Sequence, residues 1–130
     1  MLPARVISVS INRSAADVYA FAHQPVNFPK WAAGLSNTLT QDGGRWIAAT
    51  PAGTAEVVFT PPNDFGILDH WVKLATGATV YVPLRVIPNR DGAEVQFTLF
   101  REPDMSEADM ARDAGLITKD LAALKALLEA

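Results

Sequence analysis

One long amphipathic helix at the end of the chain constrains the fold more than any other feature. Residues 106–128 open with a capping-box pattern, Ser106 followed by Asp109, and acidic side chains in the first turns suit the positive end of the helix dipole. Apolar side chains then recur every three or four positions, at Met110, Ala114, Ile117, Leu121, Leu124 and Leu128. We predict a single helix here, whose apolar stripe must be buried against another layer of secondary structure.

The β-rich remainder of the chain can supply that layer. Alternating apolar and polar residues, separated by short turns, predict strands over residues 4–12, 35–41, 45–50, 54–60, 65–74, 78–87 and 93–101. The turn Asp42-Gly43-Gly44 is a strong hairpin signal. Connections this short join antiparallel neighbours, so we predict one antiparallel sheet of seven strands. Long strands in a small domain must coil, and the concave face of the sheet would wrap the C-terminal helix.

Two shorter helices separate the first strand from the others. Ser14 and Asp17 repeat the capping pattern, and Pro25 ends that helix. Residues 27–34 indicate a short second helical turn closed by Gly34. The predicted fold is therefore α+β with the order β-α-α-β6-α, and the first strand should close the sheet beside the last.

Composition limits the class of protein. The 130 residues suit one domain over residues 1–130, and 49% hydrophobic against 19% charged residues excludes a disordered chain. A net charge of −3 argues against nucleic-acid binding, and the absence of cysteine excludes disulfides and thiolate catalysis. We see no secretory signal and no apolar stretch of about 20 residues, so we expect a cytoplasmic protein without a membrane span.

Three segments carry a resemblance to a known superfamily. Residues 7–21 are an apolar strand that runs into a helix start, residues 28–31 form a short segment ending in Trp31, and residues 120–129 end a long helix. Over its whole length the chain resembles the START-like or SRPBCC superfamily, also called the helix-grip fold, although Asn27 and Lys30 replace the usual acids of the short segment. The superfamily includes lipid carriers, allergens, hormone receptors, polyketide aromatase/cyclases and oxygenase subunits. Its short bacterial members are often grouped as polyketide cyclase/dehydrase.

The period of two decides which strand residues face the concave side. It places Asp69 and Lys73 in solvent and Leu68, His70 and Val72 inside. We predict a cavity between the sheet and the N-terminal half of the last helix, while the C-terminal half of that helix should be solid core. The predicted ligand-binding residues are Trp31, Val57, Phe59, Leu68, His70, Val82, Leu84, Phe97, Met110 and Ile117.

His70 is the most informative single residue. One hypothesis makes it a polar anchor or general acid/base in an apolar pocket, and the other makes it a buried structural histidine. Asp113, one turn before Ile117, is the candidate partner, unless it is simply a solvated first-turn acid. His23 is far away in the sequence and no third ligand has suitable spacing, so we expect neither a metal nor a cofactor.

Trp71, Tyr81 and Arg85 should lie together on the convex face of the sheet. They could form an exposed cation–π cluster and a homodimer interface, or pack as ordinary cross-strand neighbours.

Three functions fit these predictions. We favour binding of a small, mostly apolar molecule (a lipid, or an aromatic or polyketide-like compound), because His70 is the one inward histidine and few other polar groups face inward. The alternative is a cofactor-independent cyclase or dehydratase that uses His70 as general acid/base. The third is a protein-interaction domain with a filled core, similar to superfamily members that act on ribosomes or chaperones.

Overall fold

A computed structural model describes residues 1–32, 38–50 and 53–130. The helical elements are α1 (Ala15–Ala22), the 3-10 turn η1 (Pro25–Asn27), α2 (Phe28–Trp31) and α3 (Glu107–Glu129). The strands are β1 (Ala4–Ile11), β2 (Leu39–Asp42), β3 (Arg45–Thr50), β4 (Gly53–Phe59), β5 (His70–Lys73), β6 (Thr79–Val82), β7 (Leu84–Asn89) and β8 (Gly92–Phe100). Gly34 and the first residues of the strand predicted over 35–41 lie outside the described residues.

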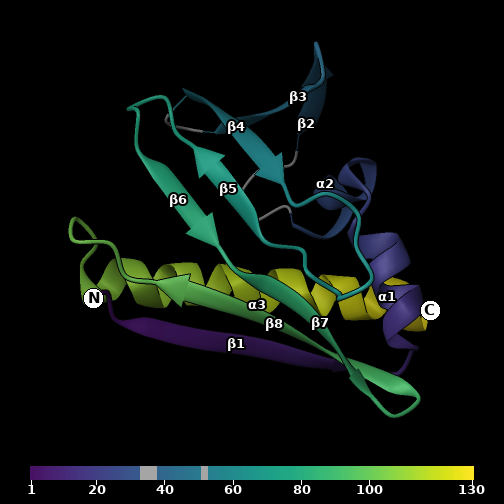
Figure 1. Cartoon of the computed structure of the whole chain (residues 1–130). Coiled ribbons are helices and arrows are strands. Elements are labelled where there is room, and N and C mark those ends of the chain that lie inside the picture. The colour runs from purple at the N-terminus through teal and green to yellow at the C-terminus, as the bar shows by residue number, and fades with distance from the viewer. Residues whose placement is uncertain (33–37, 51–52) are drawn as a thin grey trace.

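The strands form two antiparallel ladders, and the long helix packs against them (Figure 1). One ladder has the order β1-β8-β7, and the other runs β2-β3-β4-β5-β6 in chain order. The first strand lies beside the last, with Ala4 opposite Phe100 and Ile11 opposite Ala93, which confirms the predicted closure. Helix α3 runs along β1 and β8, so the predicted α+β helix-grip architecture is confirmed.

The number of strands differs from the prediction because of one proline. The segment predicted as a single strand over residues 78–87 breaks at Pro83, so the chain leaves one ladder as β6 and enters the other as β7. Proline lacks an N–H for a ladder bond, which explains the break. Main-chain bonds still join the ladders: Leu68 N–H donates to the Leu84 carbonyl over 2.8 Å.

The predicted strand over residues 65–74 is regular only from His70 onward. Before it, Gly66 has a φ of +70°, a conformation that glycine adopts freely. A Cβ at this position would lie 2.2 Å from the Val86 carbonyl oxygen, so the close approach to β7 also requires glycine. The Asn63 side chain closes the loop by accepting from the Phe65 and Ile67 N–H groups, over 3.0 and 3.1 Å. Residues 65–69 are therefore not a regular strand, although Leu68 and His70 are buried as predicted.

Helix α3 confirms the C-terminal prediction in both extent and capping. The Ser106 side chain accepts from Asp109 N–H over 3.0 Å, and the Asp109 carboxylate accepts from Ser106 N–H, also over 3.0 Å. At the other end, Arg13 donates to the Leu128 carbonyl over 2.8 Å and Lys125 donates to the Ser10 carbonyl over 2.7 Å. Both contacts tie the end of α3 to the end of β1 and to the turn that follows it.

The core lies between the apolar stripe of α3 and the concave face of the ladders. Leu121, Leu124 and Leu128 are buried, as predicted for the C-terminal half of the helix, and Val18 from α1 and Val95 from β8 are fully enclosed with them. This half of the molecule is densely packed, so the hollow regions lie elsewhere.

Candidate functional site

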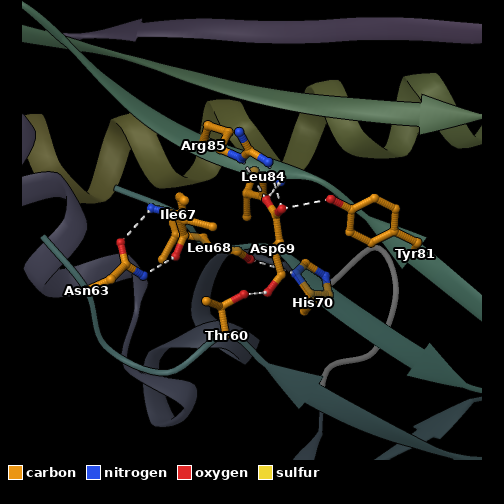
Figure 2. A network of polar contacts seen from close by, with 9 residues as sticks. All are labelled: Thr60, Asn63, Ile67, Leu68, Asp69, His70, Tyr81, Leu84 and Arg85. Atoms are coloured by element: carbon orange, nitrogen blue, oxygen red, sulfur yellow. Dashed lines mark hydrogen bonds and ion pairs between the residues drawn. The ribbon is translucent and has the colours of Figure 1, made fainter. Parts of the chain in front are cut away.

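A buried carboxylate organises the junction between the two ladders (Figure 2). Asp69 is only 5% exposed, which corrects the prediction that it lies in solvent. Its carboxylate accepts bonds from Arg85 Nε and Nη2 over 2.9 and 2.8 Å, from the Tyr81 hydroxyl over 2.8 Å and from Leu84 N–H over 2.9 Å. Asp69 faces Tyr81 and Arg85, away from His70, so the prediction was wrong about exposure because these partners cover the carboxylate.

The negative charge of the Asp69 carboxylate is paired with Arg85 and stabilised by further hydrogen bonds. Burial raises the pKa of Asp69, but the hydrogen bonds from Arg85, Leu84 and Tyr81 outweigh burial and lower the pKa to about 2. The main chain of Asp69 is also held, because its carbonyl accepts from Thr60 N–H over 3.0 Å and from the Thr60 hydroxyl over 2.6 Å. Asp69 therefore fixes the position of the next residue, His70, and has no capacity left for a ligand.

His70 is 1% exposed and faces the interior, as predicted. Its Nδ1 lies 3.1 Å from the Leu68 carbonyl oxygen. A carbonyl only accepts hydrogen bonds, so Nδ1 carries the proton. Burial lowers the pKa of His70 and outweighs the bond to Leu68 and the charge of Asp69, which act in the opposite direction, so the site favours the neutral ring.

The second nitrogen of this ring, Nε2, is buried and has no hydrogen-bond partner among the residues that the structure describes. The expected bond to Asp113 is not formed: the ring bonds to Leu68 instead, and Asp113 lines a different cavity. Aromatic rings surround His70, with Phe28 edge-on at 5.4 Å between ring centroids and Phe59 at 5.9 Å.

Two apolar cavities lie on the concave side. The first, here called the His70 cavity, has a volume of about 120 Å³, and its walls include Phe28, Ala48, Ala55, Val57, His70 and Val72. The second, here called the helix cavity, has a volume of about 210 Å³, and its walls include Val80, Val82, Phe97, Leu99, Leu116 and Ile117. Val72 and Leu74 line both cavities, so the two spaces are neighbours.

The predicted ligand-binding residues are divided among several places. Val57 and His70 line the His70 cavity, and Val82, Phe97 and Ile117 line the helix cavity. The other five do not line either cavity. Phe59, Leu68 and Leu84 surround a hollow of about 10 Å³, which is too small for a ligand. Trp31 is buried in the core, and Met110 is half-buried on α3.

The sequence prediction missed the residues that make the His70 cavity hollow. Ala48 and Ala55 lie directly opposite each other on β3 and β4, and both are buried. Two small side chains paired on a concave face leave a space that larger neighbours would fill. Phe28 was also missed, although the segment that contains it was recognised.

A larger groove of about 410 Å³ runs between His23, Trp46 and Pro62. Its walls include the ion pair between Arg45 and Glu56, whose nitrogen and oxygen are 3.0 Å apart, and the Arg45 side chain is largely exposed. This groove is more open and its lining is more polar than that of the two cavities, so it is a weaker candidate for an apolar ligand.

The convex face carries an aromatic stack, which fits the cross-strand packing alternative rather than the cation–π cluster. Trp71 stacks on Tyr81 at 5.3 Å between ring centroids, and Tyr81 stacks on Phe100 at 6.3 Å. Trp71 and Tyr81 remain 37% and 38% exposed. Arg85 is instead held by both oxygens of the buried Asp69 carboxylate, although its own side chain is about half exposed.

The described residues contain neither a metal-binding cluster nor a membrane-spanning helix. Within residues 1–32, 38–50 and 53–130, no group of three or more histidine, aspartate or glutamate side chains is arranged to hold a metal ion. In the same ranges, no helix is both long and apolar enough to cross a membrane.

Neither known protein-family models nor curated proteins match the sequence, but many solved structures match the fold. XoxI from Bacillus cereus superposes with a TM-score of 0.77 at 15% identity, over 98% of this chain and 96% of that one. The Aha1 dimer from Colwellia psychrerythraea gives 0.76 at 14% identity, over 98% and 97% of the two chains. The di-domain ARO/CYC protein BexL, from the BE-7585A biosynthetic pathway, gives 0.67 at 16% identity, over 98% of this chain and 47% of BexL.

These likenesses define the class of fold. The chain has the START-like helix-grip fold, in which a curved antiparallel sheet holds a long C-terminal helix. At such low identities the likeness establishes the fold, and function has to be argued from the cavities and from His70.

Proposed function

We propose that this protein binds a small, mostly apolar molecule on the concave side of the sheet, in the His70 cavity. The observation that carries the proposal is a partly enclosed apolar space of about 120 Å³ lined by His70, whose buried Nε2 lacks a partner among the described residues. Buried polar atoms are normally satisfied, so an unpaired one on a residue that lines a cavity is a candidate contact for a ligand.

The size of the two cavities limits the ligand. An apolar cavity of about 150 Å³ is known to accept benzene, so the His70 cavity is suited to about one ring. The helix cavity begins at the shared walls Val72 and Leu74, and it could receive a short apolar extension. A one-ring compound with a short alkyl chain is therefore a suitable probe.

Propylbenzene tests this proposal without any polar contact. We expect binding to the wild-type protein in an NMR titration, and loss of that binding in Ala55→Leu, which puts a larger side chain into the His70 cavity. Thr54→Leu is the matched control, because Thr54 is the exposed neighbour on β4 and its substitution leaves the cavity unchanged. Propylbenzene binding that survives in a folded Ala55→Leu variant would contradict the proposal.

Native mass spectrometry of freshly purified protein provides a second test. We expect a co-purified small molecule on the wild type and on Thr54→Leu, and its absence from Ala55→Leu. The same added mass on all three proteins would place the molecule outside the His70 cavity.

A cyclase or dehydratase is the second candidate function. One observation favours it: a neutral His70 with an unprotonated Nε2 is in the correct state to act as a general base. BexL has the same fold and is an ARO/CYC protein. Against it, the predicted His70–Asp113 pair is not formed. Turnover that His70→Phe abolishes, with propylbenzene binding retained, would favour the enzyme over the carrier.

The third hypothesis, a protein-interaction domain with a filled core, fits less well because both cavities leave space beside the core.

A further inference from the structure

The protonation state of His70 determines which chemical group it can bind. The Leu68 carbonyl oxygen, 3.1 Å from Nδ1, can only accept a hydrogen bond. The proton of a neutral ring therefore resides on Nδ1, and Nε2 presents a lone pair. The position of the proton follows from this contact and from the neutral ring, without reference to any ligand.

The surroundings of His70 keep the ring in this state. The Asp69 carboxylate belongs to the preceding residue but is occupied by Arg85, Tyr81 and Leu84 N–H. Among the described residues, those that line the His70 cavity include no carboxylate that could stabilise a charged imidazole there. Burial lowers the pKa of His70 further, because it penalises the charged ring.

We infer that the ligand of the His70 cavity carries a neutral hydrogen-bond donor, a hydroxyl or phenol group on an apolar body, which donates to Nε2 of His70. This inference rests on the proposed function and specifies the class of ligand. A ketone, ether or ester offers only acceptors, so it would leave Nε2 unpaired. Burying an unpaired polar atom is unfavourable, which makes the cavity selective for a donor.

Charged ligands fit the two cavities less well. A carboxylate in the His70 cavity would face the lone pair of Nε2 and find no cation in the described wall. The helix cavity has three acids in its lining, Glu102, Asp113 and Asp120, which also oppose an anion. An ammonium group could donate to Nε2, but removing a full charge from water costs far more than burying a hydroxyl.

Access to Nε2 requires a neighbouring side chain to move, because this atom is buried. Phe28 lines the same cavity and lies edge-on to His70 at 5.4 Å, nearer than Phe59 at 5.9 Å. We therefore expect the Phe28 ring to shift when a phenol enters. Its ring resonances supply a local signal of binding at this site.

The test compares probes of one shape and different polar groups: 4-propylphenol, 4-propylanisole and 4-propylbenzoate. In NMR titrations at neutral pH, we expect the phenol to bind the wild type about tenfold more tightly than the anisole, equivalent to roughly 1.4 kcal/mol, and the benzoate to bind weakest. In His70→Phe, the phenol and the anisole should bind within about twofold of each other. His23→Phe is the matched control, because it removes the other histidine of the chain and should preserve the preference.

A second measurement does not depend on any variant. Nitrogen-15 NMR of the wild-type imidazoles should show His70 protonated on Nδ1 and not on Nε2, and the phenol should shift the Nε2 resonance. A charged ring, or a ring protonated on Nε2, would overturn the inference. Equal affinity of the wild type for 4-propylphenol and 4-propylanisole would also overturn the inference, but it would leave the proposed function intact. If neither propylbenzene nor any of the three polar probes binds, both the inference and the proposed function are overturned.

Discussion

At the scale of single residues, two neighbours in the sequence have opposite electrostatic roles. Asp69 is charged and completely matched by Arg85, Tyr81 and a main-chain N–H group. His70 is neutral and keeps one nitrogen unpaired among the described residues. The first residue holds the junction of the ladders in place, and this leaves the second free to contact a ligand.

The carboxylate of Asp69 should make folding stability depend on pH in the acid range. Its pKa falls from 3.8 in the unfolded chain to about 2 in the fold, so the stabilisation is fully present above pH 4 and is lost as the pH falls toward 2. The shift corresponds to about 2 kcal/mol. In urea titrations, Asp69→Asn should therefore be less stable than the wild type at pH 6, and the difference should shrink by about that amount at pH 2.

Asp64→Asn is the control for this prediction, because Asp64 is an exposed acid in the preceding loop. Its stability should follow that of the wild type across the same range. A stability difference between Asp69→Asn and the wild type that stays constant from pH 6 to pH 2 would show that the ion pair with Arg85 contributes nothing through its charge.

At the scale of elements, helix α3 has two differently packed halves. Leu124 is fully buried in the solid end, whereas Ile117 borders the helix cavity. Deleting atoms from a dense site leaves a new void, but deleting them beside an existing cavity removes fewer contacts. The stability of α3 variants should therefore show where the molecule is hollow.

Leu124→Ala should lower the free energy of unfolding by about 2–5 kcal/mol, and Ile117→Ala by clearly less. Leu127→Ala, at an exposed position on the same helix, should change it by less than about 1 kcal/mol. Chemical denaturation of the three variants gives these values. Equal losses at Leu124 and Ile117 would argue that the helix cavity is closed in solution.

At the scale of the whole molecule, an exposed apolar stripe on the convex face is the candidate surface for the predicted homodimer interface. Val58, Trp71 and Tyr81 lie side by side across β4, β5 and β6, and all three are more than one-third exposed. Arg85 contributes less than predicted because Asp69 holds it.

If two copies associate through this stripe, Trp71→Glu should convert a dimer to a monomer in size-exclusion chromatography with light scattering. Ile87→Glu is the control, because Ile87 is equally exposed but lies on β7 in the other ladder. A folded Trp71→Glu protein with unchanged mass would remove this role from the stripe and leave the stack as ordinary cross-strand packing.

Local patterns in the sequence determined the elements and their order. Ser106, Asp109 and the apolar repeat to Leu128 specify α3 because capping and helical periodicity involve residues only three or four positions apart. The same holds for the hairpin at Gly43 and Gly44, whose positive φ values the turn requires. Alternation also placed His70 inside, because β5 is regular from that residue onward.

Only the tertiary structure decided the chemistry of the site. Asp69 is buried because Tyr81 and Arg85 cover its carboxylate, and these two partners come from strands on either side of Pro83. The His70 cavity exists because Ala48 and Ala55 meet across β3 and β4. Burial, pairing and empty volume depend on residues that are distant in the sequence, and a pattern with a period of two or three to four residues does not contain that information.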